Sequence, residues 1–160
     1  PLVFTVKSIP VASFIILVLI WVRSAQLSIV ISFLMVFPIF YENVRKGIEM
    51  CDQQLLEMAD VFELSTFTRI RYIYTSSILP YFQSACSLAL GLAWKSGIAA
   101  EVIGLPKFSI GEHLQQAKVY FDTADLFAWT LVIILLSTVL EKLVMALIRM
   151  IIKYIETECL

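Results

Sequence analysis

Four apolar blocks are the feature that most limits what this chain can fold into. They run over about residues 9–22, 27–41, 78–103 and 126–148. Hydrophobic residues make up 60% of the 160 residues and charged residues 16%, whereas soluble domains average roughly 45–50% and 25%. Strand signals are few and no repeat is present. We therefore predict an all-α, polytopic membrane protein with about four transmembrane helices, rather than a very hydrophobic soluble helical domain.

The first two blocks are shorter than the roughly 20 residues that cross a bilayer. We expect the first to gain length from the apolar residues within 2–6, and residues 23–26 to form a tight turn before the second. Aromatic side chains stand at the edges of the blocks, as interfacial belts place them: Trp21, Tyr41, Tyr81 and Trp129. The net charge of −1 gives no reason to expect a nucleic-acid partner.

Lysine and arginine residues predict an orientation. One side of the membrane would hold Arg45, Lys46, Arg69, Arg71, Lys142, Arg149, Lys153 and Lys7, and the other Arg23, Lys107 and Lys118, with Lys95 inside the third block. Positive charge favours the cytoplasmic side. Residues 42–72 and the C-terminus are therefore expected in the cytoplasm of a multi-pass plasma-membrane protein.

A charged amphipathic segment separates the second and third blocks. Cys51, Leu55, Met58, Ala59 and Phe62 recur at steps of three and four on one helical face. Gln53, Glu57, Asp60 and Glu63 fall mostly on the other face. Ser65 is a candidate N-cap of a second helix that enters the membrane, and Pro80 is expected to kink or start a helix. We expect the segment either to dock on another protein that moves the membrane part, or to be a helix that lies on the membrane surface.

Part of this segment resembles the EAA loop of permease subunits from bacterial binding-protein-dependent ABC importers. That family motif reads Glu-Ala-Ala, three residues, Gly, nine residues, Ile, one residue, Leu-Pro. Here Glu57-Met58-Ala59 takes the first position, Glu63 stands at the Gly and Ile73 at the Ile. Thr75-Ser76 stands where Leu-Pro is expected, so the motif is partly kept.

Other runs are similar to the nitrate/sulfonate/taurine branch of these permeases. They are residues 8–10, 37–39 with Asn43 and Gly47, 79–82, 88–95, 99–103 and 110–117. The resemblance covers nearly the whole chain in order. Family permeases are longer, so we expect one or more helices to precede residue 1. The chain is then a partial ABC-transporter transmembrane domain over 1–160, with a cytoplasmic coupling segment at 49–66.

The resemblance implies a set of partners. Two permease subunits would form the translocation path, with two ATP-binding subunits below it, an extracytoplasmic solute-binding protein outside and membrane lipid around it. ATP binding would draw the two coupling helices together and rock the membrane helices. The residues expected to contact the ATPase are Leu55, Glu57, Met58, Ala59, Phe62, Glu63 and Ser65. No phosphate-binding Gly-rich loop is present, so ATP hydrolysis is expected in the partner.

The third block carries a candidate path. Ser87, Gly91, Trp94 and Ile98 share one helical face. Small residues there would admit a neighbouring helix or leave room for solute. Lys95 and Glu101 are ionisable groups in or near a membrane helix and are candidates by default. We expect Lys95 to snorkel or to meet a subunit interface, and Glu101 to be structural or gating rather than solute-binding.

Other function classes are weaker. A non-transporting scaffold or regulatory subunit that pairs with an intact permease is the main alternative. An intramembrane enzyme is third, since no nucleophile–base set appears. His113 lies near Glu112, Asp122 and Asp125 without metal-ligand spacing, and a solvated loop is expected. Cys51, Cys86 and Cys159 are expected to be incidental thiols. No cofactor, metal or catalytic residue is expected, and the residues do not specify the transported solute.

Overall fold

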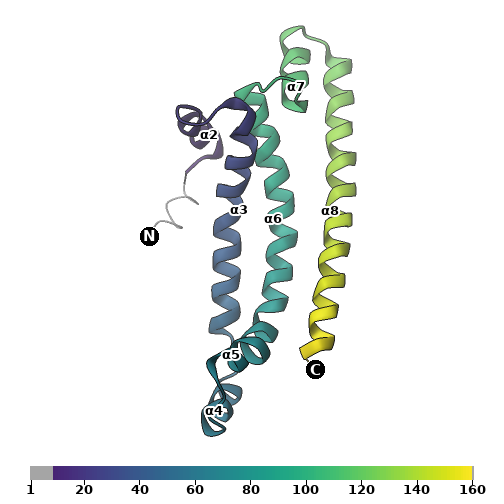
Figure 1. Ribbon diagram of the computed structural model, residues 1–160. Helices are drawn as coiled ribbons and strands as arrows, with labels where there is room; N and C mark the ends of the chain where they lie inside the picture. Colours follow the sequence, from purple (N-terminus) through teal and green to yellow (C-terminus); the bar gives the residue numbers. More distant parts are fainter. Residues whose placement is uncertain (1–8, 160) are drawn as a thin grey trace. The chain divides into compact units, whose positions relative to one another are not determined.

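The computed structural model describes residues 9–159, and every regular element in that range is helical (Figure 1). The elements are α2 (Val11–Leu19), α3 (Ser24–Glu49), α4 (Gln53–Val61), α5 (Thr66–Thr68), the π-helix η1 (Arg69–Tyr74), α6 (Thr75–Gly104), α7 (Ile110–Val119) and α8 (Thr123–Cys159). The all-α prediction is confirmed.

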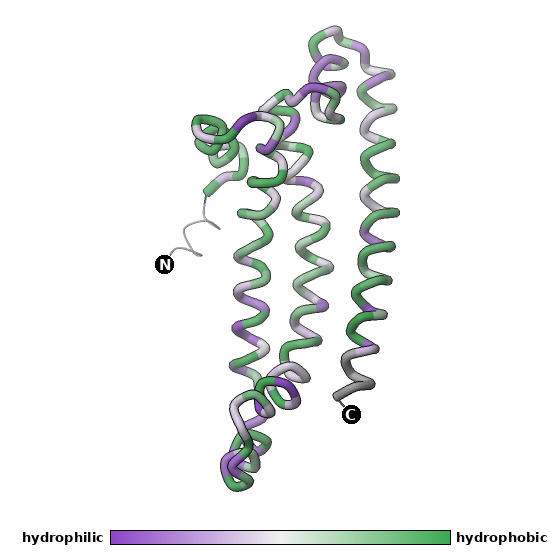
Figure 2. Tube along the Cα trace, viewed as in Figure 1, coloured by the Kyte–Doolittle hydropathy of each residue, from purple (hydrophilic) through white to green (hydrophobic). Residues whose placement is uncertain are grey.

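Three helices of the described part are long and apolar enough to cross a membrane. They are α3, the continuous helix Thr66–Gly104 formed by α5, η1 and α6, and Thr123–Tyr154 of α8. Hydrophobic residues follow α8 along much of its length (Figure 2). We expected about four such helices. The first block instead forms α2, whose nine residues span only about 14 Å, and residues 2–6 lie outside the described residues.

The helices that contain the second and third apolar blocks, α3 and α6, extend beyond the apolar residues of those blocks. α6 begins at Thr75, so Pro80 lies inside the helix and does not start it. Its missing N–H removes one backbone hydrogen bond locally. The predicted N-cap is confirmed, since the Ser65 hydroxyl accepts the N–H of Thr68 at 3.3 Å. This cap begins α5, and η1 follows α5; π-turns of this kind occur mostly as local insertions in α-helices.

The chain forms two compact units, and the first contains the residues up to Pro38 together with Ala89–Glu141. Its core packs α2, α3 and α6 around the fully buried Ile15, Leu27 and Ile31. The hydroxyls of Ser28 and Ser32 donate to the carbonyls of Gly97 (3.1 Å) and Ala93 (2.9 Å). Small residues let two membrane helices approach this closely, and the hydroxyls join them.

The second unit contains Ile39–Leu88 and Lys142–Leu160. The end of α3 meets the start of α6 at Gly47, where an added Cβ would lie 2.9 Å from the Cα of Ile78. The Ser77 hydroxyl donates to the Gly47 carbonyl at 2.8 Å. The rings of Phe40 and Phe82 pack nearby, with centroids 5.5 Å apart. These contacts fix the two helix ends from which α4 and η1 extend.

Candidate functional site

The predicted coupling segment, residues 49–66, contains α4. The Asp52 carboxylate accepts the N–H of Gln54 at 2.9 Å and caps the N-terminus of the helix. An aspartate at this position satisfies one of the free N–H groups of the first turn and suits the positive end of the helix dipole. A short helix is therefore defined at its start by its own sequence.

Glu63 ends α4 in a left-handed conformation, with φ of 50°. The N–H of Glu63 donates to the Asp60 carbonyl (3.1 Å), and the N–H of Leu64 donates to the Ala59 carbonyl (2.9 Å). This pair of bonds is a Schellman motif, whose left-handed position is usually glycine. The Gly of the family motif is replaced in this sequence, but the backbone keeps the conformation that favours Gly.

The apolar face predicted for α4 is divided in two. Ala59 is fully buried and packs with Cys51 and Ile73, so it faces the chain's own core and not a partner. Leu56 and Leu64 pack against the same cluster. The helical periodicity could not separate these side chains from their exposed neighbours, because the packing partner Ile73 comes from a later helix.

The other apolar side chains of α4 point outward and form a second surface. This outer face consists of Leu55, Met58, Val61 and Phe62, which are 43–79% exposed. The charged Glu57 and the capping Ser65 are also exposed. Val61 was not predicted for this surface, although it lies at a step of three from Met58. A helix this short thus presents apolar side chains on two sides, only one of which is covered.

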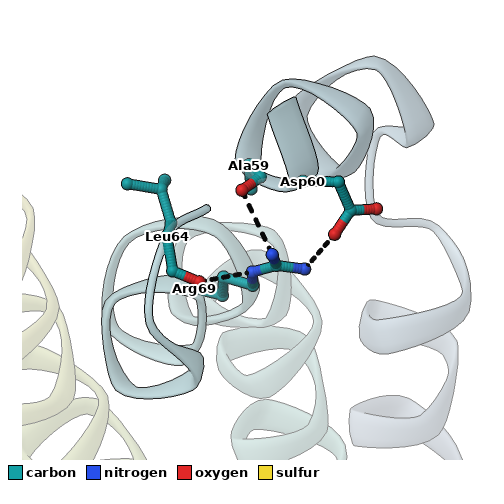
Figure 3. Close-up of polar contacts among 4 residues, drawn as sticks. All are labelled: Ala59, Asp60, Leu64 and Arg69. Carbon is teal, nitrogen blue, oxygen red and sulfur yellow. Dashed lines mark hydrogen bonds and ion pairs between the residues drawn. The ribbon is translucent and has the colours of Figure 1, made fainter. Parts of the chain in front are cut away.

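Arg69 joins the C-terminus of α4 to η1 (Figure 3). Its Nε donates to the Leu64 carbonyl at 2.9 Å and its Nη2 to the Ala59 carbonyl at 3.1 Å. Its Nη1 forms an ion pair with the Asp60 carboxylate. These contacts of Arg69 were not predicted, since nothing in the spacing relates its side chain to carbonyls five and ten residues earlier.

The residues predicted for the path lie on a less crowded part of α6. Ser87 and Lys95 are exposed, and Trp94 and Ile98 are half-buried. An added Cβ at Gly91 would meet nothing within 4 Å, whereas one at Gly97 would lie 2.9 Å from the Ser32 hydroxyl. The small residue that admits α3 is therefore Gly97, and the Gly91 face is left open by the described residues.

Glu101 is bonded within the first unit. Its Oε1 accepts the Ser28 hydroxyl at 3.3 Å, and its Oε2 accepts the N–H of Gly111 at 3.1 Å. Gly111 lies in the first turn of α7, where a carboxylate suits the helix dipole. A Cβ on Gly111 would approach the carbonyl carbon of Glu101 to 2.5 Å. A structural or gating role was expected for Glu101, and these two bonds join it to α3 and α7.

His113 is held by an aromatic contact. Its ring stacks on Trp129, with centroids 4.5 Å apart and planes 6° from parallel. His113 lies on the helix α7 and not in the loop that the sequence suggested. Among residues 9–154, whose side chains the structure describes, no group of three or more His, Cys, Asp or Glu is placed to hold a metal ion.

The second unit also contains an apolar cavity of about 460 Å³. Thr75, Ile78, Leu79, Phe82, Cys86, Ile148, Ile151 and Ile152 line it. None of these residues was predicted to form the path. The lining holds no charged side chain, so it offers no ion-pairing partner to a charged solute.

Comparison with known proteins identifies the family. The model of the "Binding-protein-dependent transport system inner membrane component" family matches residues 1–156. The "Putative aliphatic sulfonates transport permease protein SsuC" of Bacillus subtilis (strain 168) is 27% identical over 118 residues, which is 74% of this chain and 42% of that protein.

A "Probable ABC transporter permease protein" of Brucella melitensis biotype 1 is 26% identical over 101 residues, covering 63% of this chain and 41% of the relative. The chain thus spans about two fifths of the length of these curated relatives. No solved structure matches it. The expected resemblance is confirmed, and with three apolar helices and a family match over nearly its full length, the chain belongs to the inner membrane components of binding-protein-dependent transport systems.

Proposed function

We propose that this chain is the core of a permease subunit of an ABC importer and that α4 docks on a separate ATP-binding subunit. The observation that carries the proposal is the outer face of α4. Four apolar side chains are exposed at a short helix whose adjoining side is anchored by Ala59 and Leu56. Amphipathic helices bind apolar grooves in this way.

The number of exposed apolar side chains on the outer face supports docking. Full burial of a large apolar side chain stabilises by roughly 1.5–3 kcal/mol, so several outer-face residues together would offset much of the cost of association. The other coupling residues proposed from the sequence, Glu57, Glu63 and Ser65, then lie at the edge of this contact. Ala59 supports the helix from behind and does not belong to the contact surface.

The remaining assembly is proposed from the family. Residues 42–72 and the C-terminus would be cytoplasmic, ATP would be hydrolysed by the partner subunit, and a second permease and a solute-binding protein would complete the importer. The face of Ser87, Gly91, Trp94 and Ile98, with the exposed Lys95 beside it, would border the path or the permease–permease interface. The name of the relative SsuC mentions aliphatic sulfonates, so this class of anions is the first solute to test. The positively charged side chain of Lys95 could pair with such an anion.

The experiment compares Met58→Glu with Gln53→Glu in the full complex. Both residues are exposed on α4, but they lie about 140° apart around the helix. Met58→Glu is expected to remove most of the co-purified ATPase while membrane insertion is kept, and Gln53→Glu is expected to behave like the wild type. A Met58→Glu chain that retains the ATPase and transports normally would contradict docking through α4. A wild-type chain that binds an intact permease but no ATPase would favour the scaffold alternative.

A further inference from the structure

We infer that Arg69 is the positioning residue that makes α4 and η1 move as one body, so that a displacement of α4 reaches the start of α6. This inference rests on the proposed function, because only a docked ATPase would displace α4. The hydrogen bonds of Arg69 go to the carbonyls of Ala59 and Leu64 and to the Asp60 carboxylate, and none of these residues belongs to the outer face of α4 or to the predicted path. Its role would be transmission between the two.

The contacts of Arg69 are concentrated on the end of α4. The two carbonyls that it binds, Ala59 and Leu64, belong to the Schellman turn that closes the helix. A carbonyl oxygen can accept two hydrogen bonds, so the Ala59 carbonyl accepts the guanidinium in addition to the Leu64 N–H. One guanidinium therefore binds the turn at two backbone carbonyls and at the Asp60 carboxylate (Figure 3).

The backbone contacts matter more than the ion pair. The Asp60 side chain is 69% exposed, whereas that of Arg69 is 27% exposed. Exposed ion pairs contribute little, because solvent screens them. Hydrogen bonds from a charged donor to carbonyls that are partly shielded from water are stronger. The guanidinium also presents its donors in a rigid plane, which fixes direction in a way that a lysine ammonium does not.

The apolar cluster beneath α4 cannot supply this rigidity alone. Cys51, Ala59 and Ile73 join α4 to η1 by apolar contact, and apolar burial is non-directional. Such a contact resists separation of the helices but allows one to turn against the other. Arg69 lies at the first position of η1, which continues into α6 within the uninterrupted helix Thr66–Gly104. A fixed α4 therefore acts directly on the first turns of this helix.

The test measures whether the distance from α4 to α6 depends on ATP. Spin labels are placed at Gln53→Cys and Ser76→Cys, both exposed, in the full transporter complex with the native cysteines replaced by alanine. The distance is recorded without nucleotide and after trapping with ATP and vanadate. In the parent complex one distance is expected, equal in both states. In Arg69→Ala the distance is expected to change on trapping by more than the parent distribution's width, because α4 follows the ATPase and η1 does not.

Two further variants keep the inference falsifiable. Arg69→Lys retains the charge beside Asp60 but lacks the planar fork, so a smaller ATP-dependent change is expected. It decides the question if Arg69→Ala fails to assemble. Arg45→Ala is the matched control, because the ion pair of Arg45, with Glu49 at 3.0 Å, lies along its own helix; it should keep the parent distance.

The outcomes separate the two hypotheses. An unchanged distance, or a broadening that is the same with and without ATP, would overturn the role of Arg69, since a loss of stability alone does not depend on nucleotide. An absence of ATPase from the parent complex would instead count against the proposed function. Loss of the ATPase from both Arg69 variants would also overturn the inference, because Arg69 would then serve docking rather than transmission.

Discussion

The carboxylate of Glu101 accepts the backbone N–H of Gly111 at 3.1 Å, and this bond joins the last turn of α6 to the first turn of α7. The other oxygen of the same carboxylate accepts the Ser28 hydroxyl from α3. Three helices of the first unit therefore meet at one side chain. The absence of a Cβ on Gly111 is what allows α7 to approach the Glu101 backbone.

Removing this junction should destabilise the first unit. Glu101→Ala deletes two charge-assisted bonds, which are worth roughly 1.5–3 kcal/mol each. Gly111→Ala should cost about 1–3 kcal/mol through overlap with the Glu101 backbone. Thermal unfolding of the purified complex measures both. Gly91→Ala is the control, because its Cβ meets nothing within 4 Å and alanine favours the helix. Equal melting temperatures for Gly111→Ala and Gly91→Ala would contradict the close approach.

Replacing Glu63 by glycine should stabilise the end of α4. A left-handed conformation costs a non-glycine residue roughly 1–2 kcal/mol, and Glu63 adopts one, with φ of 50°. The expected gain is about 1 kcal/mol, read as slower hydrogen exchange of the Leu64 N–H. Glu57→Gly supplies the opposite sign, because glycine inside α4 should cost about 1 kcal/mol. Faster exchange in Glu63→Gly would show that the Glu63 side chain, and not its backbone, holds the turn.

The sequence predicted the helical class, the helix within residues 49–66 and the N-cap at Ser65, because these depend on local periodicity and capping. It did not predict which side of α4 is covered. That depends on Ile73, which a turn and the Arg69 contacts bring back against Ala59. Local patterns carry no information on such a return.

The same reason explains why the packing partners of the third block could not be predicted. Steps of three and four group Ser87, Gly91, Trp94 and Ile98 on one face, but periodicity does not say what that face meets. The contacts of Gly97 with Ser28 and Ser32 depend on a helix more than 60 residues away. Glu101 was predicted to have a structural or gating role from its place near a helix end, whereas its partner Gly111 had no signal beyond the family resemblance.

Cysteine labelling in intact cells tests the topology, at sites chosen because their side chains are exposed. Cys51 and Cys86 are buried, so their protection from a reagent would say little about the side of the membrane. Cysteines introduced at the exposed Glu57 and Lys118 are better placed. The orientation predicted from lysine and arginine expects Lys118→Cys to react with an impermeant thiol reagent at once, and Glu57→Cys only after permeabilisation. The reverse pattern would overturn that orientation.

The last prediction compares the face of α6 that packs on α3, at Gly97, with the open face at Gly91. Gly97→Leu should prevent assembly, because even a Cβ would lie 2.9 Å from the Ser32 hydroxyl and overpacking is costly. Gly91→Leu should insert and fold, since nothing lies within 4 Å of its Cβ. If the Gly91 face borders the path or a second permease, Gly91→Leu should still reduce transport at least tenfold or block dimerisation.

Uptake is normalised to the amount of assembled complex, and Leu90→Ile is the control, about 100° away around the helix. Normal transport by Gly91→Leu would mean that lipid covers this face, because a leucine there would then meet neither solute nor protein. The path would in that case be built from other helices.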